Sequence, residues 1–210
     1  MNTALDSIDF SRIKQQKVIA LLQKNGLYSL QDLSALRSLG YDPSDGKTYR
    51  RHSKAFTIQG SVDSVWNTYK TISPEETRVG NMVSFGLMYS RHRNTIFYAG
   101  DAYTGMEAGQ LIFLNLNLLG LTQLAVGHEI VEVNDAEKNF KICYLQNGAS
   151  TGTQLIQLRE LSNDQTEVTH ETWYRSDSVF RDMILYPPFH EKGLTEFHES
   201  VKRKVEANAL

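Results

Sequence analysis

Apolar residues recur along this chain at two spacings, and the change between them separates helical from extended segments. Near the N-terminus the spacing is helical. One set is Ile13, Val18, Leu21 and Leu22, stopped by Asn25 and Gly26, and the next is Leu30, Leu33, Leu36 and Leu39, stopped by Gly40. The pattern predicts two short amphipathic helices followed by a turn-rich joint at residues 42–46. Because this segment has too few apolar residues to fold alone, we expect residues 1–46 to form an N-terminal helical extension that packs on a main domain, residues 47–210.

The main domain is predicted to open with a strand and two consecutive helices. Residues 55–59 alternate between the two faces of a strand that Gly60 stops. Ser61 is then placed to cap a helix whose apolar face is Val62, Val65, Trp66, Tyr69 and Ile72. In residues 73–76, the serine is at the N-cap position and the proline is at the first helical position. Glu76 is at the position where its carboxylate completes a capping box. A second helix is therefore expected to begin at Ser73, after a sharp bend.

From about residue 82 to residue 175 the spacing is that of strands. The candidate strands are 82–90, 95–103, 110–118, 127–133, 139–146, 153–161 and 166–175. The connections are too short for helical crossovers, so the sheet should be an antiparallel meander. The chain then ends in a helix with one apolar stripe, Leu194, Phe197, Val201 and Val205.

Composition and charge narrow the class of protein. With 22 Lys and Arg against 24 Asp and Glu, the net charge of −2 argues against a nucleic-acid partner. The single cysteine, Cys143, excludes an internal disulfide and an all-cysteine zinc site, and its alternating apolar context predicts a buried structural thiol. The N-terminus lacks the basic start and apolar stretch of a secretory signal. The most apolar window, residues 111–126, is too short and too polar for an integral membrane segment. These features favour a cytoplasmic globular protein.

The order of elements resembles a known superfamily. Residues 56–66, FTIQGSVDSVW, run from an opening strand through a short turn into a helix with a large aromatic anchor. In this respect the chain is similar to the helix-grip superfamily that contains START lipid-transfer domains, the birch-pollen allergen family and polyketide cyclase/dehydratase-like proteins. Residues 144–152, YLQNGASTG, resemble a tyrosine-and-glycine loop in an uncharacterised branch of that superfamily. The resemblance implies an α+β helix-grip fold, in which a curved antiparallel sheet surrounds a long C-terminal helix with a mostly apolar cavity between them. It implies no catalytic residue.

The strand alternation indicates which side chains would line such a cavity. If the last four strands pair through turns near residues 136–137, 149–150 and 163–164, opposed residues share a face. One face would then carry Val131, Val133, Phe140, Ile142, Tyr144, Leu155, Gln157, His170, Thr172 and Tyr174. The other would carry Ile130, Glu132, Lys141, Cys143, Ile156, Leu158, Glu171 and Trp173. The first set suits a small-molecule cavity. The second is half apolar, so we expect the N-terminal helices to cover it.

Two histidines are candidates for polar chemistry in this cavity. His170 falls on the predicted cavity face, and His190 lies four residues before Leu194, close to the apolar stripe of the last helix. They would serve either as a polar anchor or acid/base pair, or as two separately hydrogen-bonded structural residues. His198 is expected to be solvated. Metal-ligand atom types occur in His170, Glu171, Asp182, His190 and Glu191. However, the sequence contains no metal-ligand spacing, no phosphate-binding loop and no serine nucleophile elbow, so we predict no metal and no cofactor.

The leading hypothesis is therefore a non-enzymatic protein that binds a small, largely hydrophobic molecule, lipid-like or polyketide-like. The predicted ligand-binding residues are Tyr144, Gln157, His170, Thr172, Tyr174, His190, Leu194 and Phe197. One alternative is a cyclase- or dehydratase-like enzyme that moves a proton with His170 or His190. The other is a protein-interaction module, for example a homodimer, that docks through the basic tip at residues 91–93 or the apolar stretch at residues 111–121.

Overall fold

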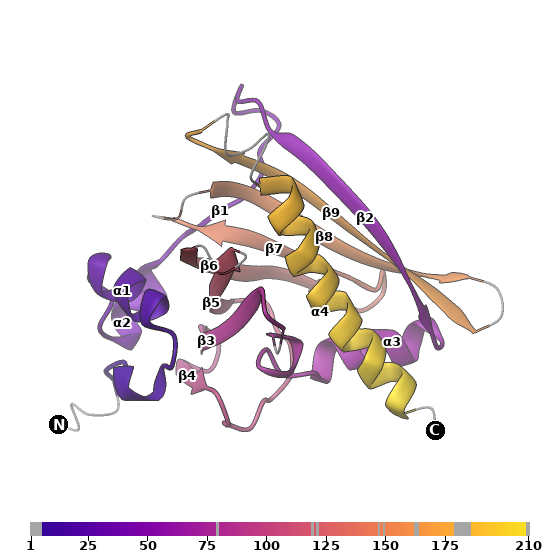
Figure 1. Cartoon of the computed structure of the whole chain (residues 1–210), viewed down its shortest axis with the longest axis horizontal. Coiled ribbons are helices and arrows are strands. Elements are labelled where there is room, and N and C mark those ends of the chain that lie inside the picture. Colours follow the sequence, from indigo (N-terminus) through magenta and orange to yellow (C-terminus); the bar gives the residue numbers. More distant parts are fainter. Residues whose placement is uncertain are drawn as a thin grey trace.

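The structure, a computed structural model, describes residues 6–78, 80–118, 120, 122–146, 148, 150–161, 164–178 and 186–208. In this part of the chain, nine antiparallel strands form one curved sheet that wraps around a long C-terminal helix (Figure 1). The helical elements are η1 (Phe10–Arg12), α1 (Gln16–Lys24), α2 (Leu30–Ala35), α3 (Val62–Thr71), η2 (Glu76–Arg78) and α4 (Tyr186–Asn208). The α+β helix-grip architecture expected from the sequence is confirmed.

The strands are β1 (Ser38–Leu39), β2 (Arg50–Gln59), β3 (Val83–Ser90), β4 (Thr95–Tyr98), β5 (Gln110–Leu118), β6 (Thr122–Asn134), β7 (Asn139–Leu145), β8 (Ser150–Leu161) and β9 (Gln165–Ser176). Their spatial order is β2-β9-β8-β7-β6-β5-β3-β4, and the short β1 pairs with the end of β7. The predicted antiparallel meander is present from β5 to β9, but not at its start, because β3 pairs with both β4 and β5 and so lies between them. Since β2 pairs along its whole length with β9, the first and last strands of the main domain lie side by side at one edge of the sheet.

Most predicted elements are present, but several differ in extent. The strands β2 and β6 begin earlier than predicted, at Arg50 and Thr122, and β4 ends at Tyr98 instead of residue 103. Ser61 caps α3 as expected and accepts from the backbone N–H of Ser64 at 3.3 Å. The second N-terminal helix ends at Ala35 instead of continuing to residue 39, and Leu39 pairs with Tyr144 in the sheet. The capping contacts at Ser73 form, but they begin only the 3-10 turn η2. The strand predicted to begin at residue 153 begins at residue 150 as β8; residues 147 and 149 lie outside the described residues.

The two faces of the sheet carry different helices. On the inner face, α3 and α4 cover a core made of Ile58, Val65, Trp66, Tyr69, Ile72, Phe140, Ile156, Leu158, Val168, Phe197, Val201 and Val205. On the outer face, the N-terminal helices pack on β3, β5 and β6 through a second core that includes Val18, Leu22, Leu33, Leu87, Tyr89, Leu111 and Phe113. Figure 1 shows α4 crossing the sheet far from α1 and α2.

The N-terminal segment is fastened to the sheet by Arg91. Its guanidinium donates to the carbonyls of Ser34 and Leu36 and pairs with Glu129 at 2.8 Å. The basic tip proposed as a docking site therefore has an intramolecular partner at this position. The division into residues 1–46 and 47–210 stays a prediction.

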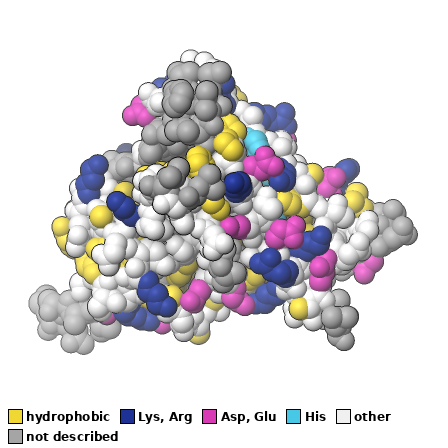
Figure 2. Space-filling model, viewed as in Figure 1, with side chains coloured by type: hydrophobic (Ala, Val, Ile, Leu, Met, Phe, Trp, Pro, Cys, Tyr) yellow, Lys and Arg dark blue, Asp and Glu magenta, His cyan; other side chains and the backbone are white. Residues whose placement is uncertain are grey.

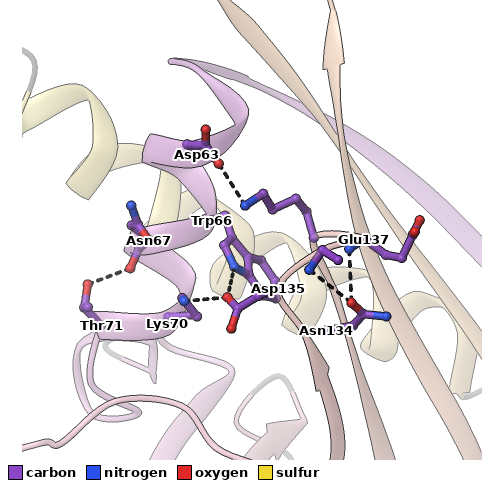
Figure 3. Close-up of polar contacts among 10 residues, drawn as sticks. Asp63, Trp66, Asn67, Lys70, Thr71, Asn134, Asp135 and Glu137 are labelled. Atoms are coloured by element: carbon purple, nitrogen blue, oxygen red, sulfur yellow. Dashed lines mark hydrogen bonds and ion pairs between the residues drawn. The ribbon is translucent and has the colours of Figure 1, made fainter.

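The turn between β6 and β7 anchors α3. Asp135 at this turn accepts from the indole Nε1 of Trp66 at 2.7 Å and pairs with Lys70 Nζ at 2.5 Å (Figure 3). Lys138, on the same turn, pairs with Asp63 at 2.8 Å. These contacts fix the helix that carries Tyr69 against the inner face.

The register of β8 corrects the predicted faces. The predicted turns set Gln157 opposite both Ile142 and His170, but Ile142 pairs with Gln154 and His170 with Ile156. The register of β8 thus differs from the prediction by three residues against β7 and by one residue against β9. Because each difference is odd, each one exchanges the predicted faces, so β8 has its faces exchanged, whereas on β9 the two exchanges cancel. Gln157 and Leu155 therefore belong to the outer face, and Gln157 is exposed, so its placement in the cavity was wrong. Ile156 and Leu158, assigned to the outer face, lie in the inner core.

A bulge in β6 corrects one further position. The register shifts between Ile130 and Glu132, which leaves Val131 at 37% exposure instead of on the cavity face. Ile130 is opposite Ile142 and shares its face, so its predicted outer placement was also wrong.

The cover of the outer face also differs from expectation. The helices α1 and α2 lie over β3, β5 and β6, whereas the segment after β1 covers the outer side of β7 to β9. There, Tyr41 stacks on Trp173 with ring centroids 5.7 Å apart. Cys143 is buried as predicted and lies 3.4 Å from the hydroxyl of Thr153.

Candidate functional site

A cavity of about 220 Å³ lies between the inner face of the sheet and α4. Its wall is mostly apolar and includes Met82, Val83, Leu114, Leu116, Val126, Ile142, Phe189, Leu194 and Phe197. Its polar wall includes Arg78, His128, Tyr144, Ser150, Gln154, His170 and His190. An apolar wall with a few convergent polar groups is the usual composition of a small-molecule site, and the volume is just below the range of about 300–1,000 Å³ for drug-sized ligands. The cavity therefore suits a small ligand.

Three histidines, a glutamine and a tyrosine form a hydrogen-bonded chain at the polar side of the cavity. His170 and His198 are buried, and His128 is half-buried in the cavity wall. Tyr69 Oη lies 2.6 Å from His198 Nδ1, and His198 Nε2 lies 2.8 Å from His170 Nδ1. His170 Nε2 is 3.0 Å from Oε1 of Gln154, whose Nε2 is 3.4 Å from His128 Nε2. The chain joins α3, α4, β9, β8 and β6, so it fixes the helices relative to the sheet.

One set of tautomers satisfies every contact of this chain. Because the amide oxygen of Gln154 only accepts, His170 must donate from Nε2 and accept at Nδ1. His198 then donates from Nε2 and accepts at Nδ1 from Tyr69, whose pKa burial raises well above its ordinary value. Each hydrogen bond is then donated in the direction from Tyr69 toward His128. When the histidines are neutral, every bond of the chain has one donor hydrogen and one acceptor.

Burial keeps these histidines neutral. Burial, followed by the positive charge of Arg78, lowers the pKa of His198 to about 3 and that of His128 to about 4. The pKa of His170 is lowered well below 6.5 by burial first, and then by His198 and Arg78. Figure 2 shows little histidine on the face it draws, where acidic and basic side chains are interspersed.

The structure brings together most of the predicted site residues. Those that line the cavity are Tyr144, His170, His190, Leu194 and Phe197. Thr172 is buried beside it and its hydroxyl lies 2.9 Å from Nε2 of His190. Tyr174 is buried on the same face but does not contribute to the wall, and Gln157 is on the other face. The roles of these residues in binding stay predictions.

The predicted approach of His170 and His190 is confirmed, with ring centroids 6.1 Å apart. Both ring nitrogens of His170 are within hydrogen-bond distance of other side chains, His198 and Gln154. This arrangement suits a structural residue better than a catalytic base, which needs a nitrogen available to the substrate.

The expectation for His198 was wrong, because this side chain is 1% exposed and central to the chain. The signal was in the sequence: His198 lies four residues after Leu194 and three before Val201, on the apolar stripe. Gln154 was missed through the register of β8. Arg78 was missed because the turn that carries it has no local signature beyond its cap.

No group of three or more His, Cys, Asp or Glu side chains within the described residues is arranged to hold a metal ion. Asp182, one of the metal-ligand atom types named above, lies outside those residues. In the same part of the chain, none of the helices has the length and apolarity needed to cross a membrane.

Removing the hydroxyl of Tyr69 tests the hydrogen-bonded chain. Tyr69→Phe leaves Nδ1 of His198 buried without a donor, so we expect the free energy of unfolding to fall by about 1–3 kcal/mol in urea denaturation. Tyr28→Phe is the matched control. Because Tyr28 is 52% exposed, water can satisfy the group that loses the hydrogen bond from its hydroxyl. Equal losses in the two variants would show that the chain does not contribute.

Comparison with solved structures identifies the same fold in other proteins. Norcoclaurine synthase from Thalictrum flavum, in complex with dopamine and hydroxybenzaldehyde, matches with a TM-score of 0.57 and 12% identity, over 76% of this chain and 88% of that one. A START superfamily protein from Mycobacterium smegmatis matches with a TM-score of 0.50 and 13% identity, over 76% and 99%. A conserved protein from Geobacillus kaustophilus matches with a TM-score of 0.52 and 9% identity, over 75% and 96%. No family model and no curated protein matches the sequence.

At these identities the likenesses establish the fold and not an activity. The helix-grip fold that the sequence resembles is confirmed, and the neighbours include an enzyme as well as a START superfamily protein. Function has to be argued from the cavity itself.

Proposed function

We propose that this protein binds a small, largely apolar molecule in the cavity between the sheet and α4. The observation that carries the proposal is the cavity wall, which is apolar along β3, β5, β6 and α4 and polar at the histidines. Affinity would come mainly from burying apolar ligand surface, at about 25 cal/mol per Å² before the costs of association. The polar groups would set the ligand's orientation.

Contacts in the site argue against His170 as a catalytic base and against docking through the apolar stretch at residues 111–121. An enzyme that uses His170 as a base would have to break a hydrogen bond to free a ring nitrogen. In the apolar stretch proposed for docking, Leu114 is buried, and Leu116 faces the same cavity. Both leucines are thus explained by ligand binding.

Filling the cavity should abolish binding. Val126 lies on β6 in the cavity wall, and Val126→Trp would occupy the space with an indole ring. We expect the affinity for Nile red, a neutral apolar probe, to fall at least about tenfold in a fluorescence titration, a loss of about 1.4 kcal/mol. Native mass spectrometry after incubation with a lipid extract should likewise show retained ligand only in the unaltered protein.

Val131→Trp is the matched control, because Val131 is on the same strand but exposed at the bulge. Its affinity for Nile red should equal that of the unaltered protein. Unaltered protein that binds neither the probe nor any extract component would overturn the proposal, and so would equal binding by the two tryptophan variants.

A further inference from the structure

Arg78 places a positive charge in the cavity wall without a carboxylate beside it. Its guanidinium has five donor hydrogens. Among the described residues, its one hydrogen bond is to the carbonyl of Thr77 at 3.4 Å, and no Asp or Glu oxygen lies within 4.0 Å of it. The guanidinium instead lies over the ring of Phe197, 4.2 Å from the centroid, which is a cation–π contact. Most of its donors are therefore available to a molecule in the cavity.

The carboxylate that acts electrostatically on Arg78 is already engaged in other contacts. Glu196 on α4 interacts with Arg78 electrostatically, but its carboxylate accepts from the backbone N–H of Met82 at 2.9 Å and of Val83 at 3.2 Å. Gly80 lies against the same carboxylate, where a Cβ would come within 2.2 Å of it. Because these contacts hold Glu196 in place, turning it toward Arg78 would leave two backbone donors without their acceptor.

The rest of the described cavity wall does not balance the charge. It contains no Asp or Glu, and its histidines are neutral. Burial lowers the pKa of Arg78 to about 10, which still leaves it protonated near neutral pH. Its charge reaches across the site, since it contributes to the lowered pKa of His128, His170 and His198.

We propose that the ligand is an amphipathic organic acid whose carboxylate binds the guanidinium of Arg78 while its apolar body lies along Leu114, Leu116, Val126 and Ile142. This inference rests on the proposed function and specifies the ligand class. A guanidinium and a carboxylate match as a planar two-bond pair, and such charge-assisted bonds are about twice as strong as neutral ones. A long-chain phospholipid is disfavoured by the cavity of about 220 Å³.

The test compares two ligands that differ only in the head group, octanoate and 1-octanol, each displacing Nile red near neutral pH. We expect octanoate to bind at least about tenfold more tightly than octanol. Arg78→Met keeps an apolar stem over Phe197 and removes the charge, so it should remove this preference and leave octanol binding within about threefold. Arg203→Met, an exposed position on α4 outside the cavity wall, is the control and should keep the preference.

The outcomes separate the two proposals. If neither Nile red nor any component of the lipid extract binds in the cavity, the proposed function fails and this inference with it. If Nile red binds but octanoate and octanol displace it equally, or neither displaces it, the inference is overturned and the proposed function stands. Should Arg78→Met not fold, the comparison of the two ligands on the unaltered protein still decides, because it needs no variant.

Discussion

Acidification from pH 6.5 to about 4 is expected to destabilise this protein strongly, because its buried histidines stay neutral in the folded state. The pKa of His128 is about 4 and that of His198 about 3, and burial is the main cause of both values. In the unfolded chain each imidazole titrates near 6.5. Below that pH the unfolded chain takes up protons that the folded state excludes, so the free energy of unfolding falls as the pH falls. Above it, neither state binds the protons, and the full stability is present.

The slope of this loss can be estimated. Each histidine that is protonated only in the unfolded state contributes about 1.4 kcal/mol per pH unit. His128, His170 and His198 act in the same window, so a loss of several kcal/mol between pH 6.5 and about 4 is a large share of the 5–15 kcal/mol typical of a folded domain. Carboxylates with lowered pKa, such as Glu76, add to this loss only from about pH 5 downward, as the unfolded chain begins to protonate them.

Urea denaturation from about pH 7.5 to about pH 4.5 measures this slope. In His128→Phe, which keeps a ring against Tyr144, the slope below pH 6.5 should decrease by about one proton, or about 1.4 kcal/mol per pH unit. His92→Phe is the control, because His92 is exposed and lies outside the hydrogen-bonded chain. A stability that stays constant from pH 7 to 4.5, or an equal change in both variants, would contradict the assignment of neutral buried histidines.

The sequence predicted the fold more reliably than the faces of individual strands. The class depends on the order of elements, which periodicity and turn residues indicate directly. A face depends on register, and register depends on turn length. For β8 the pairing register with each neighbouring strand was wrong by an odd number of residues, so Gln157 was predicted in place of Gln154 while Tyr144 and His170 were placed correctly.

The candidate site was predictable only where one element decides the position. His170 and His190 follow from strand alternation and helical spacing, and the rule that placed His190 also places His198 on the buried stripe. Arg78 is different, because its position depends on how a single turn lies against α4. Residue spacing therefore does not predict that the Arg78 side chain lies in the cavity wall, because only the three-dimensional fold brings it there.

Gly152 is expected to be the least replaceable glycine of the described sheet. Its φ of +142° lies where side-chain-bearing residues are strongly disfavoured, and a Cβ there would come within 1.9 Å of the carbonyl oxygen of Trp173. That oxygen belongs to the backbone of β9, so the clash cannot be relieved by a side-chain rotation. Gly152 also stands just before Thr153, the first residue of β8 that pairs with β7. Its conformation therefore shapes the point at which β8 begins to pair with β7 beside the cavity.

Gly152→Ala should reduce the free energy of unfolding by more than about 3 kcal/mol, because conformational strain of about 1–3 kcal/mol adds to the displacement of β9. Gly46→Ala is the control: its φ is also positive, at +69°, but nothing lies within 4 Å of a Cβ there, so only about 1 kcal/mol should be lost. Urea denaturation of both variants measures the difference. Equal losses would mean that β9 moves aside without cost. Because β9 carries His170 and Thr172, a displaced β9 should also weaken Nile red binding in Gly152→Ala, whereas Gly46→Ala should bind normally.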